Sequence, residues 1–345
     1  MKITSHKTVA LLIFLVFLHA LVLAAGFIAP YDPVQQDRDR PYAPPAAIHF
    51  ADAAGKFHVR PFVYQQRVRE GSFDQYEDDH ATRIPLKFFV TGASYRLLGV
   101  IPGTLHLFGT EEGSVNLLGT DGYGRDLFSR ILYGGQISLL AGLLAASVSL
   151  LIGTFVGGAS GYFGGWTDSI VMRLAELCLA LPWLYLLFGV RAFLPLLVSP
   201  LKAFLIVVVV IGALGWARPA RLVRGVALSA KERDFVRAAK GFGASHFYIL
   251  RRHVLPQTRS VILTQAAILI PQYILAEVTL SFLGLGIPEP APSWGNLLSS
   301  LQQYSVLSSY WWMYLPAVAM VPFFFGYLAL SSSLQDGPRT DKIES

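Results

Sequence analysis

The sequence has little charge and almost no cysteine. Only 14% of its 345 residues are Asp, Glu, Lys or Arg, whereas about a quarter of a typical soluble domain is charged. This composition excludes an ordinary soluble enzyme and a disordered chain. The single cysteine, Cys178, excludes an intrachain disulfide. Hydrophobic residues make up 53% of the chain and the mean hydropathy is +0.49, which together indicate a membrane protein.

The charges that are present gather in two regions. Residues 31–130 hold 11 Lys/Arg and 13 Asp/Glu, more than half of the 22 acids, so the remainder is more apolar than the average suggests. Residues 217–259 hold ten Lys/Arg against Glu232 and Asp234. Basic loops of membrane proteins stay in the cytoplasm, so we read this cluster as a cytoplasmic loop in preference to a nucleic-acid site.

Six apolar segments are candidates to cross about 30 Å of hydrocarbon as helices. They are 9–29, 137–158, 170–190, 201–217, 260–285 and 311–334. Lys2 and Lys7 precede the first segment, which predicts cytoplasmic N- and C-termini and a cytoplasmic 217–256 loop. A cleaved signal peptide is the alternative for the first segment, because small residues follow its apolar core at 24–26. The length of that segment favours a retained span.

The polar segment 31–116 is predicted to be a small β-containing extracytoplasmic insertion. Runs at 57–59, 61–64 and 86–90 have the composition of strands and are separated by turn residues. The histidines of this segment, His49, His58, His80 and His106, lack metal-ligand spacing, so we expect ordinary surface histidines and no metal site.

The basic loop contains the pattern of a short amphipathic helix. Ser229 and Glu232 have capping-box spacing, which predicts that a helix begins there. Its apolar stripe, at i, i+3, i+4 and i+7, is Phe235, Ala238, Ala239 and Phe242. Gly243 should end this helix, and Ser245 should cap a second one that runs to Pro256. Periodicity alone does not decide whether this stripe contacts the lipid surface or a protein partner.

This stretch resembles the EAA loop of binding-protein-dependent ATP-binding cassette (ABC) permeases, in which two alanines precede a glycine and a Leu-Pro pair. Arg237 stands where that family usually has a glutamate. The resemblance implies a helix that sits in a groove of a partner ATPase. The residues predicted to form this ATPase-coupling surface are Glu232, Asp234, Phe235, Val236, Arg237, Ala238, Ala239, Gly243, Leu255 and Pro256.

Two further stretches resemble the dipeptide and oligopeptide subgroup, specifically the second of its two permease subunits. They are LGTDGYGRDLFSR at 118–130 and AEVTLSFLGLGIPEPAPSWG at 276–295. The resemblance implies an all-α polytopic membrane protein of six transmembrane helices, the type I ABC importer permease fold, here with the small β-containing insertion. The sequence has no G-x-x-x-x-G-K-[ST] phosphate loop, so another chain is expected to hydrolyse ATP.

The expected domain organisation has four parts. A cytoplasmic N-tail and first transmembrane helix (1–30) precede the extracytoplasmic insertion (31–116). The ABC permease transmembrane domain (117–336) contains the coupling loop 217–256, and a cytoplasmic tail (337–345) follows.

The resemblance also implies the function and the partners. The chain is expected to be a non-catalytic permease subunit in a bacterial inner membrane, without a cofactor, that imports di- or oligopeptides. Its expected partners are a second homologous permease, two cassette ATPase subunits, an extracytoplasmic solute-binding protein and the lipid bilayer, with no nucleic acid. Nickel, a glycan fragment or a peptide-like antibiotic is the alternative cargo.

Two other groups of polar residues stand out. Glycines and alternating charges before the second span are expected to pin a loop through turns and ion pairs; they are Gly119, Asp121, Gly124, Arg125, Asp126 and Arg130. Gln265, Gln272 and Glu277 in the fifth span are candidates for a translocation path or gate, since a carboxylate in a span needs water or a partner. A buried hydrogen-bonding role is equally open for them.

Two rival functions belong to other classes. An ion-coupled secondary transporter would import its solute without ATP, although no inverted repeat is evident in the sequence. A membrane-anchored sensing module would depend on the 31–116 insertion for its activity.

Overall fold

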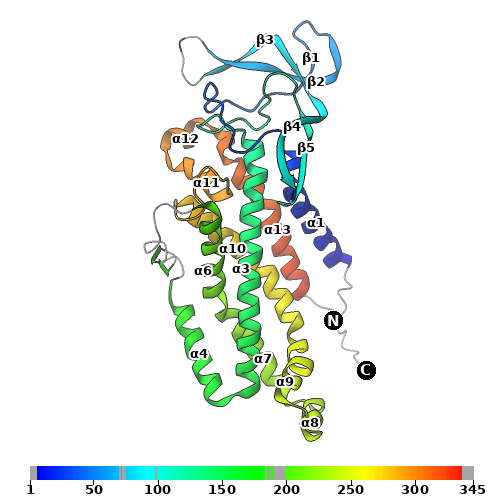
Figure 1. Ribbon diagram of the computed structural model, residues 1–345, viewed down its shortest axis with the longest axis vertical. Helices are drawn as coiled ribbons and strands as arrows, with labels where there is room; N and C mark the ends of the chain where they lie inside the picture. Colours follow the sequence, from blue (N-terminus) through cyan, green and yellow to red (C-terminus); the bar gives the residue numbers. More distant parts are fainter. Residues whose placement is uncertain are drawn as a thin grey trace, which may run out of the picture. The chain divides into compact units, whose positions relative to one another are not determined.

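The computed structural model describes residues 6–69, 71, 75–97, 99–182, 185–186, 188–189 and 199–335 (Figure 1). The chain divides into two compact units. Unit 1 takes residues 1–15, 140–277 and 322–345, and unit 2 takes 16–139 and 278–321. Four helices contribute residues to both units: α1 (His6–Leu23), α3 (Leu127–Phe163), α10 (Arg259–Phe282) and α13 (Leu315–Gln335).

Among the described residues, four segments are long and apolar enough to cross a membrane. They are His6–Leu23, Leu127–Phe163, His246–Phe282 and Trp311–Gln335. A fifth arises if α6 (Pro200–Gly215) and α7 (Ala217–Lys231), which meet at a 40° bend, form one broken span.

The prediction of six spans is therefore not confirmed. The predicted span 170–190 falls partly on α4 (Gly165–Ala180), a helix of 16 residues. Residues 183–184, 187 and 190 of that span lie outside the described residues, as does the predicted tail 337–345.

In unit 1, three glycines one turn apart allow α3 to approach α7 at backbone distance. Gly153, Gly157 and Gly161 follow the G-x-x-x-G-x-x-x-G spacing that lets helices pack closely. A Cβ on Gly161 would lie 2.6 Å from the Arg224 carbonyl oxygen, and one on Gly157 would overlap the backbone of Ala220. Side chains at these positions would separate the two helices.

Polar contacts join α4 to the same pair of helices. The Arg224 guanidinium on α7 donates to both carboxylate oxygens of Asp168, at 2.5 Å each. The Ser160 hydroxyl on α3 also donates to Asp168. Farther along α4, Arg173 and Glu176 form an exposed ion pair at 3.5 Å, as their three-residue spacing predicts.

Unit 2 contains the β structure predicted for the insertion. Strands β1 (His49–Ala51), β2 (Phe57–Val68) and β3 (Tyr76–Pro85) form an antiparallel sheet in that order. Strands β4 (Lys87–Leu97) and β5 (Ile101–Gly109) form a separate hairpin. The two predicted runs at 57–59 and 61–64 belong to the single strand β2.

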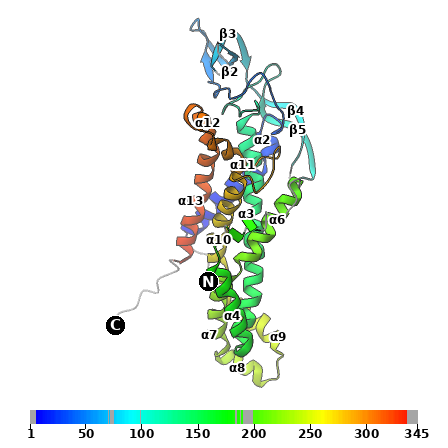
Figure 2. The ribbon, with the colours of Figure 1, turned by 90° about the vertical axis from the view of Figure 1, so that its left-hand side faces the viewer.

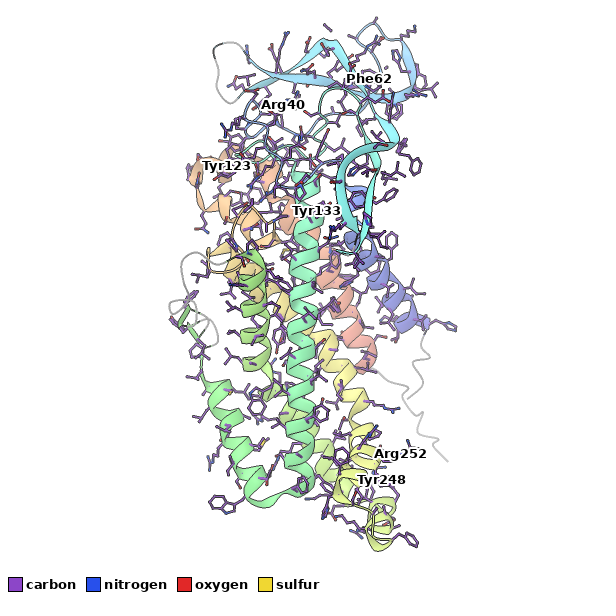
Figure 3. All side chains as sticks on the ribbon, viewed as in Figure 1. Arg40, Phe62, Tyr123, Tyr133, Tyr248 and Arg252 are labelled. Carbon is purple, nitrogen blue, oxygen red and sulfur yellow. The ribbon has the colours of Figure 1, made fainter. Side chains whose placement is uncertain are left out.

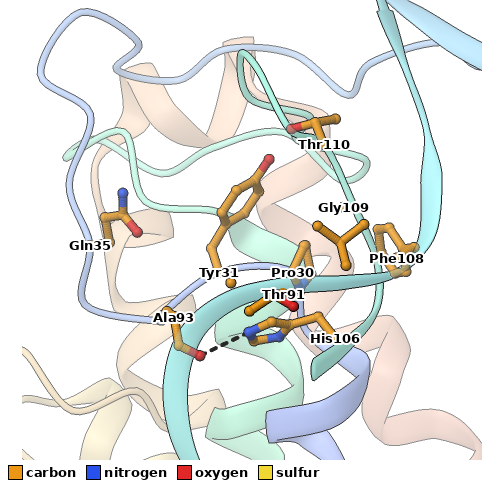
Figure 4. A pocket seen from close by; sticks show the side chains of 11 residues that line it. Pro30, Tyr31, Gln35, Thr91, Ala93, His106, Phe108, Gly109 and Thr110 are labelled. Carbon is orange, nitrogen blue, oxygen red and sulfur yellow. Dashed lines mark hydrogen bonds between the residues drawn. The ribbon is translucent and has the colours of Figure 1, made fainter. Parts of the chain in front are cut away.

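A buried histidine holds the hairpin against α2 (Ala25–Ile28), the short helix that follows α1. The His106 Nδ1 lies 2.5 Å from the Ala29 carbonyl oxygen, and its Nε2 lies 2.9 Å from that of Ala93. Figure 4 shows the contact between His106 and Ala93, two residues that line a pocket with Tyr31 and Gln35. His106 is therefore a buried structural residue, whereas the sequence predicts an ordinary surface histidine.

The segment before α11 (Trp294–Ser299) is fixed to the start of α3. Ser293 and Asn296 form a capping box that begins α11. The Trp294 indole is fully buried and donates to the Ile131 carbonyl oxygen at 3.0 Å. Gly134 allows this approach, because a Cβ there would lie 3.2 Å from the Ser293 backbone. These contacts position the chain around Glu289.

We expect Gly157→Leu to destabilise unit 1 by about 1–3 kcal/mol, because overpacking forces the helices apart. The thermal unfolding midpoint of the purified full chain should fall. Gly225→Ala is the matched control on α7, since nothing lies within 4 Å of a Cβ at that position. Equal midpoints for the two variants would show that α3 and α7 do not depend on this contact.

Candidate partner-binding surface and ion-pair cluster

The predicted loop 217–256 is largely helical. It contains α7, α8 (Asp234–Gly241), α9 (His246–Ile249), a π-helical turn, η1 (Leu250–Val254), and the first half of a 3₁₀ turn, η2 (Leu255–Thr258). Figures 1 and 2 both draw α7, α8 and α9 beside one another. The sequence thus predicted its amphipathic character but not how much of it is helix.

The predicted capping box at Ser229 and Glu232 is wrong. Ser229 lies inside α7, which continues to Lys231, and α8 begins at Asp234 after the extended residue Arg233. The spacing fits a capping box, but the preceding helix continues through Ser229 and leaves its backbone in the α region. Ser245 caps α9 as predicted, since its hydroxyl accepts a hydrogen bond from the Tyr248 N–H at 3.2 Å.

Val236 anchors α8 to unit 1. Its side chain is fully buried in a cluster with Tyr162 from α3, Ala227 from α7, and Ile249 and Val254 from the segments that follow. Burying a valine stabilises a fold by about 1.5–3 kcal/mol. One residue of α8 therefore ties the helix to several other segments of the unit.

Three of the four residues of the predicted stripe face solvent, and the buried Val236 was not part of that stripe. Phe235 and Ala238 are exposed, and Phe242 is 92% exposed, while Ala239 packs against the buried cluster. Thus α8 leaves aromatic surface uncovered at one end of unit 1. Phe247 and Tyr248 are exposed as well. Figure 3 shows Tyr248 near this end of unit 1.

Charged residues surround this aromatic surface. The exposed cations are Arg233, Arg237, Lys240, Arg251 and Arg252. Arg237 pairs with Glu232 at 3.3 Å, and both side chains are mostly exposed, so this ion pair adds little stability. Aromatic residues within a basic rim are typical of a protein-binding surface.

Gly243 turns the chain between α8 and α9. Its φ is +78°, a backbone conformation that glycine adopts without strain. The Gly243 N–H donates to the Lys240 carbonyl oxygen at 3.0 Å, and this bond helps to close α8. Leu255 and Pro256 lie in η2 and are partly buried.

The three candidate path residues on α10 have different surroundings. Glu277 is fully buried and Gln265 is 8% exposed, whereas Gln272 is exposed. The Gln265 Oε1 has no hydrogen-bond partner among the described residues. The structure therefore does not place the three side chains in one common environment.

In unit 2, the predicted ion pairs exist and gain a partner that sequence analysis missed. The Arg125 guanidinium donates to Asp121 at 2.7 Å and to Glu289 at 2.7 Å. Arg130 donates to Glu289 at 2.9 Å and lies 3.3 Å from Asp121. We call these four residues the ion-pair cluster. Tyr123 covers it, with the Arg125 guanidinium carbon 4.6 Å from its ring centre (Figure 3).

Charge matching along the sequence could not have pointed to Glu289, because the charges of Asp121, Arg125, Asp126 and Arg130 sum to zero. In the structure Asp126 accepts hydrogen bonds from Ser129 and Asn116 instead, and Glu289 is the only acid between Glu277 and Asp336. A buried cation needs an opposite charge.

Asp126 belongs to a separate group at the start of α3. Its carboxylate accepts hydrogen bonds from the Ser129 N–H at 2.8 Å and from the Asn116 amide at 3.1 Å. Burial raises the pKa of the Asp126 carboxyl to about 6, because removal from water outweighs these hydrogen bonds.

Two of the predicted turns are also present. Gly119 and Gly124 have φ values of +79° and +71°, as tight turns require.

The long apolar helices define an integral membrane protein. The family model described as binding-protein-dependent transport system inner membrane component matches residues 149–336, more than half of the chain. The chain belongs to this family.

The relatives are peptide permeases by name. The dipeptide transport system permease protein DppC of Bacillus subtilis is 41% identical over 219 residues, which cover 63% of this chain and 66% of that protein. The oligopeptide transport system permease protein OppC of Haemophilus influenzae is 38% identical, with 66% and 70% covered. The chain thus spans slightly less than two thirds of the length of the Bacillus protein.

The crystal structure of an amino acid ABC transporter with histidines matches 60% of this chain and 92% of its own, at 19% identity and a TM-score of 0.43.

We expect Glu289→Gln to destabilise unit 2 by about 1–3 kcal/mol, because it leaves Arg130 buried with less opposite charge. Limited proteolysis of the full chain should then cut unit 2 faster. Glu176→Gln is the matched control, since Glu176 forms an ion pair in which both side chains are exposed. Equal proteolysis rates for the two variants would contradict a stabilising role of the cluster.

We expect a protonated-carboxyl infrared band from Asp126 that disappears as the pH rises through about 6. Since its folded pKa lies above the unfolded value, its contribution to stability falls as the pH rises from about 4 to about 6. Asp126→Asn should remove the band. Asp52→Asn should leave it unchanged, because hydrogen bonds from His58 and Lys56 lower the pKa of Asp52 to about 2. Persistence of the band in the Asp126 variant would refute this assignment.

Proposed function

We propose that this chain is a transmembrane permease subunit of an ABC importer for di- and oligopeptides. It forms the translocation path with a second permease and couples that path to separate ATPase subunits. The observation that carries this proposal is the exposed aromatic surface of α8 in a member of a binding-protein-dependent transport family. The printed names of the relatives support peptides as the cargo.

The chemistry of α8 supports docking into a protein groove. An amphipathic helix binds a groove through apolar anchors spaced along one face. Phe235 and Phe242 are seven residues apart and supply such anchors, with the small residue Ala238 between them. The remaining residues of the proposed coupling surface are Glu232, Asp234, Val236, Arg237, Ala239, Gly243, Leu255 and Pro256.

The buried end of α8 supports transmission of movement. Val236 packs in one cluster with Tyr162 of α3 and Ala227 of α7. Packed side chains resist separation, so a displacement of α8 by an ATPase moves the adjoining ends of α3 and α7 with it. Such rigid-body movement is a known way to switch between two states of a helical protein.

The topology and partners belong to the same proposal. We place both termini in the cytoplasm, the 31–116 insertion outside, and a sixth span at 170–190, in the type I arrangement of 117–336. Two cassette ATPases would bind the α8 surface of this chain and of its permease partner, and a solute-binding protein would deliver the cargo. Gln265, Gln272 and Glu277 are proposed to contribute to the path or its gate.

We expect Phe242→Ser to lower ATP-driven peptide uptake by about tenfold, because loss of an aromatic anchor costs an interface about 2 kcal/mol. The measurement is uptake by proteoliposomes that contain the complete transporter. Phe242 is 92% exposed, so the fold should not depend on it.

Trp166→Ser is the matched control. Trp166 is 85% exposed, in the first turn of α4 and outside the proposed coupling surface, so uptake should persist in this variant. Undiminished uptake with F242S would remove α8 from the coupling pathway. Uptake that needs an ion gradient and no ATP would support the secondary-transporter alternative instead.

A further inference from the structure

The two β structures of unit 2 differ in their charge. Residues 87–109, which form the β4–β5 hairpin, contain Lys87 and Arg96 but no acid. Residues 49–85, which form the β1–β2–β3 sheet, contain six acids. The insertion is therefore not uniformly polar. The composition of its hairpin suits a less polar environment than that of its sheet.

The hairpin runs back along the end of the first helix. His106 contacts the Ala29 carbonyl, and Tyr95, nearer the turn, packs against Gly26. The contact nearer the turn is therefore the one with the earlier residue, Gly26, and the contact farther from the turn is the one with Ala29. Figure 1 draws the hairpin beside α2.

The turn lies beyond the last of these contacts. Tyr95 pairs with Gly103, and Leu97 pairs with Ile101 at the end of the ladder. Val100, the described turn residue before β5, is three residues from Gly103 and so lies about 10 Å past the Tyr95–Gly103 pair at the usual rise of a strand. Over 10 Å a helix advances about seven residues. The turn therefore reaches the level of the last two turns of α1, a helix with the length and composition of a membrane span.

The end of the hairpin is apolar and exposed. Val100 is 78% exposed and Ile101 is 58% exposed. Arg96, also exposed, is the nearest cation to the turn, and Tyr95 lies beside it. Exposed aliphatic residues next to an arginine and a tyrosine match the boundary between lipid headgroups and acyl chains.

We propose that the turn of the β4–β5 hairpin inserts into the headgroup region of the leaflet at which α1 ends. The occupant of this surface is the lipid bilayer, because an acid-free hairpin presents exposed Val100 and Ile101 at the level where the candidate span α1 ends. The hairpin stops at the headgroup region, because open strand edges have no hydrogen-bond partners in hydrocarbon. Arg96 is placed to contact lipid phosphate. This inference goes beyond transport and requires only that α1 spans the membrane.

The test uses an environment-sensitive fluorophore on the full chain. In a Cys178→Ser background, Val100→Cys is labelled with nitrobenzoxadiazole, and Val59→Cys on β2 is the matched control. Val59 is also a valine, 88% exposed, but it belongs to the acid-rich sheet. Both proteins are reconstituted in phosphatidylethanolamine and phosphatidylglycerol vesicles with nitroxide-labelled lipids.

We expect lipid-borne quencher to reduce the fluorescence at position 100 at least about twofold more than at position 59, with a quencher near the headgroup more effective than one deep in the bilayer. Iodide in the water should show the reverse preference. Ile101→Cys provides an independent position if the first variant folds poorly.

Two results would overturn the proposal. One is equal quenching by lipid at positions 59, 100 and 101. The other is protection from iodide at position 100 that appears only when the solute-binding protein is added, which would make the turn a protein-docking surface.

Discussion

The contact between the backbones of α3 and α7 is the constraint on which the coupling end of unit 1 depends. Gly153, Gly157 and Gly161 bring the two helices within reach of one another, and only then can their side chains form a common cluster. Tyr162 follows the last glycine directly and joins Val236 in that cluster. The position of α8 therefore depends on three glycines of α3, a helix that is distant from α8 in the sequence.

Local signals predicted much of the fold but not the orientation of its parts. Period and capping predicted the amphipathic stretch at 235–242 and the start of α9 at Ser245, and apolar length predicted α10 and α13. The burial of Val236 could not be predicted from α8 alone, because its partners lie on α3, α7 and η1. The same three-dimensional packing decides that Ala239 faces inward while Phe242 faces solvent.

The sequence likewise predicted only part of the ion-pair cluster. The spacing of Asp121, Arg125 and Arg130 indicated ion pairs, because residues so close in sequence have few other ways to satisfy their charges. Glu289 follows Arg130 by 159 residues, so no periodicity connects them. Charge matching identifies Glu289 only after Asp126 is known to bond to Ser129 and Asn116 and the arginines are known to be buried. For Asp126, the sequence likewise gives no indication of its burial.

The ion-pair cluster has a formal charge of zero, since two arginines face one aspartate and one glutamate. A group of fixed charges that sums to zero does no net work when the voltage across a bilayer changes. Displacement of the four residues as one body would therefore add no net gating charge to unit 2.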